Sequence, residues 1–202
     1  MYPQSNSARS VRDLSGVWDF RFNADEPWQP IAVPASYNDQ SPDPEFRRHY
    51  GMAYYRTTFT VPEGARRVLR FDAVTHNAVV RLNGQEIASH RGGFLPFEAD
   101  ITALAQPGET VTLDVEVDNR IGHSSLPVGN EGGTAFFGSD NAGIPAVEAG
   151  KARQQAQGIN LPNFDFFNYA GITRPVHLCT TPAAYIRDVT VAADMTGKLR
   201  YT

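Results

Sequence analysis

The chain has 202 residues, 41% of them hydrophobic, and a formal net charge of −4 at pH 7. This length fits one all-β domain, and the composition is sufficient for a real core. Because basic and acidic residues are interspersed, the charge pattern argues against a nucleic-acid partner, which needs clustered Lys and Arg. The adjacent arginines at 47–48 and 66–67 are expected to be solvated surface. No apolar stretch is long enough to span a bilayer, so no membrane partner is expected.

The cysteine and histidine content indicates the cellular compartment and whether a metal site is expected. Cys179 is the only cysteine, which excludes an intrachain disulfide and favours a reducing compartment. The start, MYPQSNSARSVRD, lacks the apolar segment of a secretory signal, so we expect a cytoplasmic protein. The histidines have no metal-ligand spacing, and one cysteine cannot complete a thiolate site. Neither a metal nor another cofactor is therefore expected.

The pattern along the chain is that of β-strands. In 110–118, TVTLDVEVD, apolar and polar residues alternate, which places four apolar side chains on one buried face: Val111, Leu113, Val115 and Val117. Similar strands are expected at 17–22, 54–61, 67–74 and 173–180. Asn83-Gly84, between the strands 76–82 and 85–90, predicts a hairpin, because both residues tolerate the positive φ of a type I′ turn. One helical turn is expected at 100–104, with Asp100 as its N-cap.

Short strands punctuated by Gly, Pro and Asn predict an all-β fold, a jelly-roll, galactose-binding-like β-sandwich over 1–182. The long segment 119–157 has no strand pattern and is expected to be a functional or mobile loop. New strands are expected at 185–192 and 198–202. Because two strands cannot bury a sandwich face, we interpret 183–202 as the truncated start of a second, immunoglobulin-like β-domain.

Two stretches of sequence carry a family resemblance. Residues 78–102, AVVRLNGQEIASHRGGFLPFEADIT, resemble the jelly-roll sugar-binding domain of glycoside hydrolase family 2. Residues 165–176, DFFNYAGITRPV, resemble the β-glucuronidases of that family, as do 13–20 and 33–39. The resemblance covers about 13–182. It departs from the family pattern at Thr173, where His is common, and in the long 119–157 segment.

The resemblance implies retaining hydrolysis of β-D-glucuronides, which needs two carboxyl groups about 5–5.5 Å apart. In the family both are glutamates on a C-terminal (β/α)₈ barrel, and no part of this sequence reads as repeated βα units. We therefore expect no catalytic residue in this chain, and expect the chain alone to be inactive. The partners implied are a glucuronide, the C-terminal domains of a longer protein, and further copies of that protein in a homo-oligomer. None of the strand and turn glutamates is assigned to catalysis: Glu86, Glu98, Glu109 and Glu116.

Asp165 is the residue we expect to bind substrate. In an extended run, Asp165, Phe167 and Tyr169 share one face, and a carboxylate among aromatic rings needs hydrogen-bond donors such as sugar hydroxyls. The resemblance implies that the matching Asp contacts the sugar. Phe164 and Asn163 are further candidates for the same site. The alternative is a turn Asp that caps backbone N–H groups.

The sequence is also compatible with other functions. The chain could be a stand-alone carbohydrate-binding module, or a domain of a family 2 β-galactosidase or β-mannosidase. Trp18 and Trp28 could stack on sugars, although a Trp within a strand pattern is more often part of the core. Cys179 is expected to be an inert, buried small hydrophobe.

Overall fold

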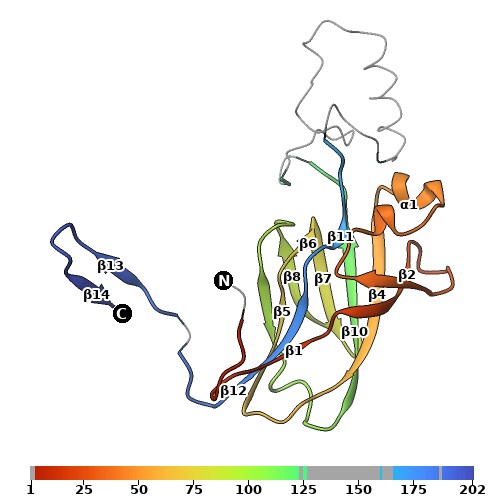
Figure 1. Ribbon diagram of the computed structural model, residues 1–202. Helices are drawn as coiled ribbons and strands as arrows, with labels where there is room; N and C mark the ends of the chain where they lie inside the picture. The colour runs from red at the N-terminus through yellow and green to blue at the C-terminus, as the bar shows by residue number, and fades with distance from the viewer. Residues whose placement is uncertain (1–2, 123–124, 127–159, 161–165, 187) are drawn as a thin grey trace, which may run out of the picture.

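The computed structural model describes residues 3–122, 125–126, 160, 166–186 and 188–202. Two antiparallel sheets form most of this part, as Figure 1 shows, so the all-β prediction is confirmed. The six-stranded sheet has the order β3 (Gln29–Val33), β2 (Gly16–Arg21), β4 (Met52–Thr60), β10 (Thr110–Asp118), β7 (Asn77–Leu82), β8 (Gln85–Arg91). The four-stranded sheet has the order β1 (Ser10–Asp13), β12 (Val176–Thr181), β5 (Arg66–Phe71), β9 (Phe97–Asp100).

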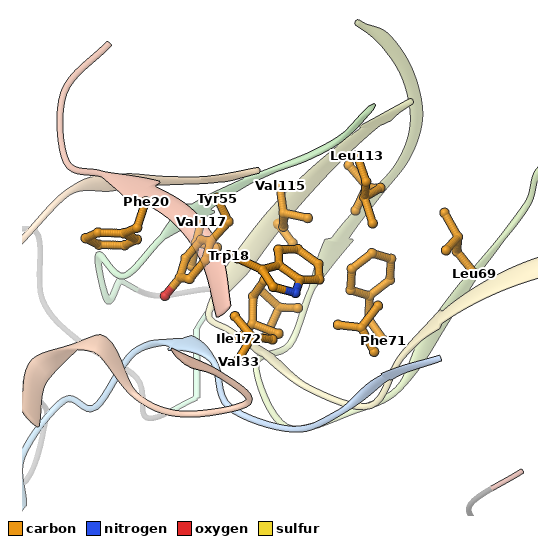
Figure 2. Close-up of a cluster of buried hydrophobic side chains, with 14 of the residues drawn as sticks. Trp18, Phe20, Val33, Tyr55, Leu69, Phe71, Leu113, Val115, Val117 and Ile172 are labelled. Carbon is orange, nitrogen blue, oxygen red and sulfur yellow. The ribbon is translucent and has the colours of Figure 1, made fainter. Parts of the chain in front are cut away.

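The core lies between these sheets and follows from period-two alternation. The four apolar residues expected to face inward from β10 are all at most 1% exposed. Trp18 and Phe20 reach the core from β2, and Leu69 and Phe71 reach it from β5 (Figure 2). Burial of such side chains is the main favourable term in folding, worth about 1.5–3 kcal/mol for each fully buried one. Trp18 is therefore a core residue, and its Nε1 donates to Leu14 O at 2.9 Å.

The hairpin of β7 and β8 forms where it was expected. Asn83 has φ 49° and Gly84 has φ 83°, the positive values that a two-residue type I′ turn requires. The strand expected at 173–180 begins later, at Val176. Residues Gly171–Ile172 form a separate short strand, β11, which pairs with β6 (Val74–Thr75).

The helices were not expected from the sequence. A 3-10 turn, η1, spans Tyr37–Asp39, and a short helix, α1, spans Pro44–Arg48. The expected turn near Asp100 is present, since Asp100 Oδ1 accepts from Thr102 N at 3.0 Å, but it does not extend into a helix. Pro107 and Gly108 follow after two further residues, and both disfavour helix.

One arginine prediction is wrong. Arg67 was expected on the solvated surface, yet it is 5% exposed. Its guanidinium donates to Gly64 O at 2.9 Å and to Thr102 O at 2.6 Å, so the charge is buried against backbone carbonyls. Such partners compensate the loss of water around a buried donor.

The C-terminal residues form a small hairpin of their own, β13 (Val191–Ala193) with β14 (Leu199–Tyr201), which stands away from the sandwich in Figure 1. The strands expected at 185–192 and 198–202 are therefore much shorter than predicted. Their side chains are exposed, so no buried face extends the pairing. The division at 182–183 and the immunoglobulin-like second domain stay predictions. None of the helices in the described ranges has the length and apolar character needed to cross a membrane.

Candidate functional site

The three residues expected to bind sugar, Asp165, Phe164 and Asn163, lie outside the described residues, as does most of the 119–157 segment. The structure resumes immediately afterwards, at Phe166. The neighbourhood of the expected site is therefore defined by residues 166–172 and by the elements that hold them. We call this part of the sandwich the site end; in Figure 1 it includes α1 and β11.

A cation and two aromatic rings meet at the site end. The guanidinium carbon of Arg47, on α1, lies 4.2 Å from the ring centre of Phe167 and 5.5 Å from that of Tyr169. The two rings meet edge to face with centroids 4.7 Å apart. The hydrogen bond from Arg47 to the Tyr169 side chain raises the pKa of Arg47, and Asp39 pairs with the same guanidinium. Tyr169 is 43% exposed, so this cluster presents aromatic surface to solvent.

Buried asparagines tie the same segment to the sandwich. Asn38 on η1 donates to Phe46 O at 2.9 Å and accepts from Ala170 N at 2.9 Å. The side chain of Asn160 donates to Asn168 O at 2.8 Å. These side chains replace the strand pairing that an irregular backbone lacks, because a buried N–H or C=O must find a partner.

Asn119 and Asn168 extend this network across the site end. Asn168 Nδ2 donates to Asn119 O at 2.8 Å. Asn119 in turn accepts from Gly51 N at 2.7 Å and donates to His49 O at 2.8 Å. The end of β10 and the chain after α1 are thereby linked to the segment that carries Phe167 and Tyr169.

His76 supplies the last contact to Asn168. Its Nε2 lies 2.5 Å from Asn168 Oδ1, and since a carbonyl oxygen only accepts, Nε2 carries the proton. Burial lowers the pKa of His76, which keeps the ring neutral near pH 7. The ring therefore acts as a fixed hydrogen-bond donor in the support of the site.

The segment then enters β11 against a tyrosine. Gly171 has φ 122°, and a Cβ at this position would lie 2.6 Å from the hydroxyl of Tyr55. Burial raises the pKa of Tyr55, so its hydroxyl stays protonated. Only a glycine fits both this backbone conformation and this contact.

The described residues of the site end are suited to binding rather than to acid–base catalysis. Asp39 pairs with Arg47, and Asp118 pairs with Arg120 at 2.7 Å. Two histidines, His49 and His76, have pKa values lowered by burial. Within the ranges that the structure describes, no group of three His, Cys, Asp or Glu side chains is arranged to hold a metal ion. Phe167 and Tyr169, held in place by Arg47 and by the asparagine network, form a partly aromatic rim at the site end.

Sequence reasoning missed the support of this rim. Arg47 is at the surface as expected, with its side chain 45% exposed, but its contacts with Phe167 and Tyr169 were not predicted. The local signal for α1 was present in Asp43-Pro44, an N-cap followed by a proline, with Asp43 Oδ1 accepting from Glu45 N at 2.9 Å.

A jelly-roll sandwich with an aromatic rim at one end is typical of carbohydrate-binding domains, and comparison with known proteins agrees. The chain belongs to glycosyl hydrolases family 2: the model of that family's sugar binding domain matches residues 11–182. The β-glucuronidase of Faecalibacterium prausnitzii is 56% identical, with a TM-score of 0.83 over 100% of this chain and 36% of that one.

Other relatives have the same description. The β-glucuronidase of Bifidobacterium dentium, solved with coumarin-3-O-glucuronide, is 52% identical, with a TM-score of 0.78 over 96% of this chain and 33% of that one. The β-glucuronidase of Paenibacillus borealis is 36% identical over 98% of this chain and 34% of its own length. This chain thus spans about a third of the length of the relatives it matches.

Proposed function

We propose that this chain is the N-terminal sugar-binding domain of a β-glucuronidase and that it forms part of the wall of the site where β-D-glucuronides are hydrolysed. The observation that carries the proposal is the identity of 56% and 52% to two solved β-glucuronidases over nearly the whole chain. In this proposal, as the family resemblance implies, the two catalytic glutamates belong to a barrel outside these 202 residues. The domain's contribution is then to orient substrate rather than to break the bond.

Asp165 is the residue we propose to contact the sugar, with Phe164 and Asn163 beside it. The proposal rests on the sequence DFFNYAGI at 165–172 and on the rim that follows it. Asp165 itself lies outside the described residues, but Phe167 and Tyr169 are held close to Arg47, and their rings provide apolar surface of the kind that covers a sugar ring. A carboxylate beside such surface accepts hydrogen bonds from adjacent sugar hydroxyls.

The test is kinetic and uses the full polypeptide encoded by the gene that contains this sequence. With an aryl β-D-glucuronide as substrate, Asp165→Ala is expected to lower kcat/KM by about 2–3 kcal/mol of transition-state stabilisation, roughly 30- to 160-fold. Asp25→Ala, which removes an exposed carboxylate from the β2–β3 turn, is the matched control and is expected to leave kcat/KM unchanged. Unchanged kinetics in Asp165→Ala would remove Asp165 from the site.

A panel of aryl glycosides separates the remaining alternatives. Preferred turnover of a β-galactoside or β-mannoside would overturn the glucuronide assignment while leaving the family intact. Turnover of none, together with tight glycan binding by residues 1–202 alone, would favour a stand-alone carbohydrate-binding module. A cytoplasmic location and a homo-oligomeric full-length protein belong to the same proposal, and cell fractionation and sedimentation of that protein test them.

A further inference from the structure

A second concave site lies on the face of the six-stranded sheet that points away from the core. It encloses about 230 Å³. Strands β2, β4 and β10 form its floor, and Trp28 from the β2–β3 connection forms one wall. The side chains that line this outer-face pocket include Arg21, Trp28, Tyr54, Arg56, Asp114 and Glu116.

For Trp28 the sequence favoured a core position over sugar stacking, but the residue lines this pocket. The guanidinium carbon of Arg21 lies 4.1 Å from the Trp28 ring centre, and that of Arg56 lies 4.8 Å from it. These cation–π contacts fix an indole ring over a charged sheet surface. The result is an aromatic wall beside several charged groups that can orient a polar ligand.

Two of the three arginines in the pocket are paired with carboxylates, and the third has no such partner in the part of the chain that the structure describes. Arg56 makes a two-pronged pair with Asp114, at 2.6 and 3.3 Å, and Arg81 donates to Glu116 at 2.9 Å. Arg21 differs, because no carboxylate of a described residue lies within ion-pairing distance of its guanidinium. Its Nη1 donates to the backbone oxygen of Glu26 at 3.3 Å. Its Nε is buried and donates to no acceptor in the described part of the chain.

A partly desolvated guanidinium with spare donors favours an anionic ligand, and a planar fork matches a carboxylate best. The paired residues favour hydroxyls instead, since Asp114 and Glu116 keep acceptor lone pairs and Arg56 and Arg81 keep N–H donors. The volume suits a single sugar ring, as pockets for drug-sized ligands begin at about 300 Å³. A protein partner would need roughly 800 Å² of surface rather than one small pocket.

We propose that the outer-face pocket is a binding site for a saccharide residue that carries a carboxylate, with Arg21 pairing with the acid group and Asp114 and Glu116 accepting from ring hydroxyls. The pocket is separate from the site end. Its Arg56–Asp114 pair lies four residues along β10 from Asp118, where the site end begins. The proposal therefore does not rest on the catalytic role of the full-length protein.

The experiment titrates the ¹⁵N-labelled 202-residue chain with methyl β-D-glucuronide and, separately, with methyl β-D-glucoside, which differs only at the acid group. Saturable amide shifts are expected in β4 and β10, around Arg56 and Asp114. The glucuronide is expected to bind about tenfold more tightly than the glucoside, because one charge-assisted hydrogen bond contributes roughly 1.4 kcal/mol, which is a factor of ten in affinity. Shifts confined to the site end, or none at all, would overturn the proposal.

Arg21→Gln tests the assigned partner of the acid group. It is expected to bring the two sugars to nearly equal affinity, whereas Arg12→Gln, which removes an exposed arginine from β1, is expected to keep the tenfold preference. An unchanged preference in Arg21→Gln contradicts the assignment. Sodium acetate is the third ligand: if it produces the same shifts over the same concentration range, the pocket binds an adventitious ion only and the saccharide proposal fails.

Discussion

His76 and Asn168 lie 92 positions apart in the sequence, yet the ring nitrogen of the first is 2.5 Å from the side-chain oxygen of the second. The same asparagine donates from Nδ2 to Asn119 O at 2.8 Å. It is 4% exposed, so water cannot replace either partner. One amide thereby joins the residue between β6 and β7, the end of β10 and the segment that leads into β11.

Removing that amide should be costly for the fold. Asn168→Ala leaves a buried N–H on His76 and a buried carbonyl on Asn119 without their partner, and each such group costs about 1–3 kcal/mol. We expect the free energy of unfolding to fall by about 2–4 kcal/mol in urea titrations of the 202-residue chain. Asn77→Ala, at a half-exposed position of β7, is the control and should change it by less than about 0.5 kcal/mol. Equal losses in the two variants would contradict the role of the network.

The neutral state of His76 makes stability depend on pH in a defined direction. Burial lowers the pKa of His76, and that of His49, below the value near 6.5 that the unfolded chain retains. The unfolded chain therefore binds more protons below pH 6.5, so stability is complete above this pH and decreases as the pH falls further. Urea midpoints measured from pH 8 to pH 5 should show this decrease, and it should be smaller in His76→Gln. A profile in His76→Gln identical to the wild type would refute the assignment.

The sheets could be predicted because their signals are local. Alternation in TVTLDVEVD places four side chains in the core, and Asn83-Gly84 reverses the chain, without reference to any distant residue. Helix α1 was missed because five residues are too few for a 3.6-residue period, although Asp43-Pro44 carried the capping signal.

Contacts between distant segments could not be predicted for the opposite reason. Arg67 looks like a surface charge until Thr102, 35 positions later, is placed against it. Trp28 looks like a core residue until Arg21 and Arg56 are seen to hold it on the outer face. Each depends on which distant segment the fold brings close, and one sequence carries no signal for such pairs.

Gly171 offers a test of the close contact with Tyr55. Gly171→Ala combines a φ of 122° with a Cβ that would lie 2.6 Å from the tyrosine hydroxyl. Gly16→Ala has the positive φ, 147°, with nothing within 4 Å, so it isolates the backbone cost, of order 1–3 kcal/mol. We expect Gly171→Ala to lose clearly more stability than Gly16→Ala. Adding Tyr55→Phe should recover part of the excess, and a double-mutant cycle with no coupling would show that the hydroxyl does not limit the position.

A buried carboxylate directly after β5 provides the last test. Asp72 is 2% exposed and lies 2.8 Å from Arg70 Nε and 3.2 Å from His177 Nε2. Asp72→Ala removes one partner of a mostly buried guanidinium, so we expect a loss of up to about 3–5 kcal/mol, the typical cost of breaking a buried ion pair. Glu98, which pairs with the same arginine at 3.0 Å from the solvent side, is the internal control, and Glu98→Ala should cost less than about 1 kcal/mol. Both are measured by urea unfolding at pH 7. Burial is the main difference between the two carboxylates. Equal losses would therefore mean that burial does not make the Asp72–Arg70 pair more important for stability than the Glu98–Arg70 pair.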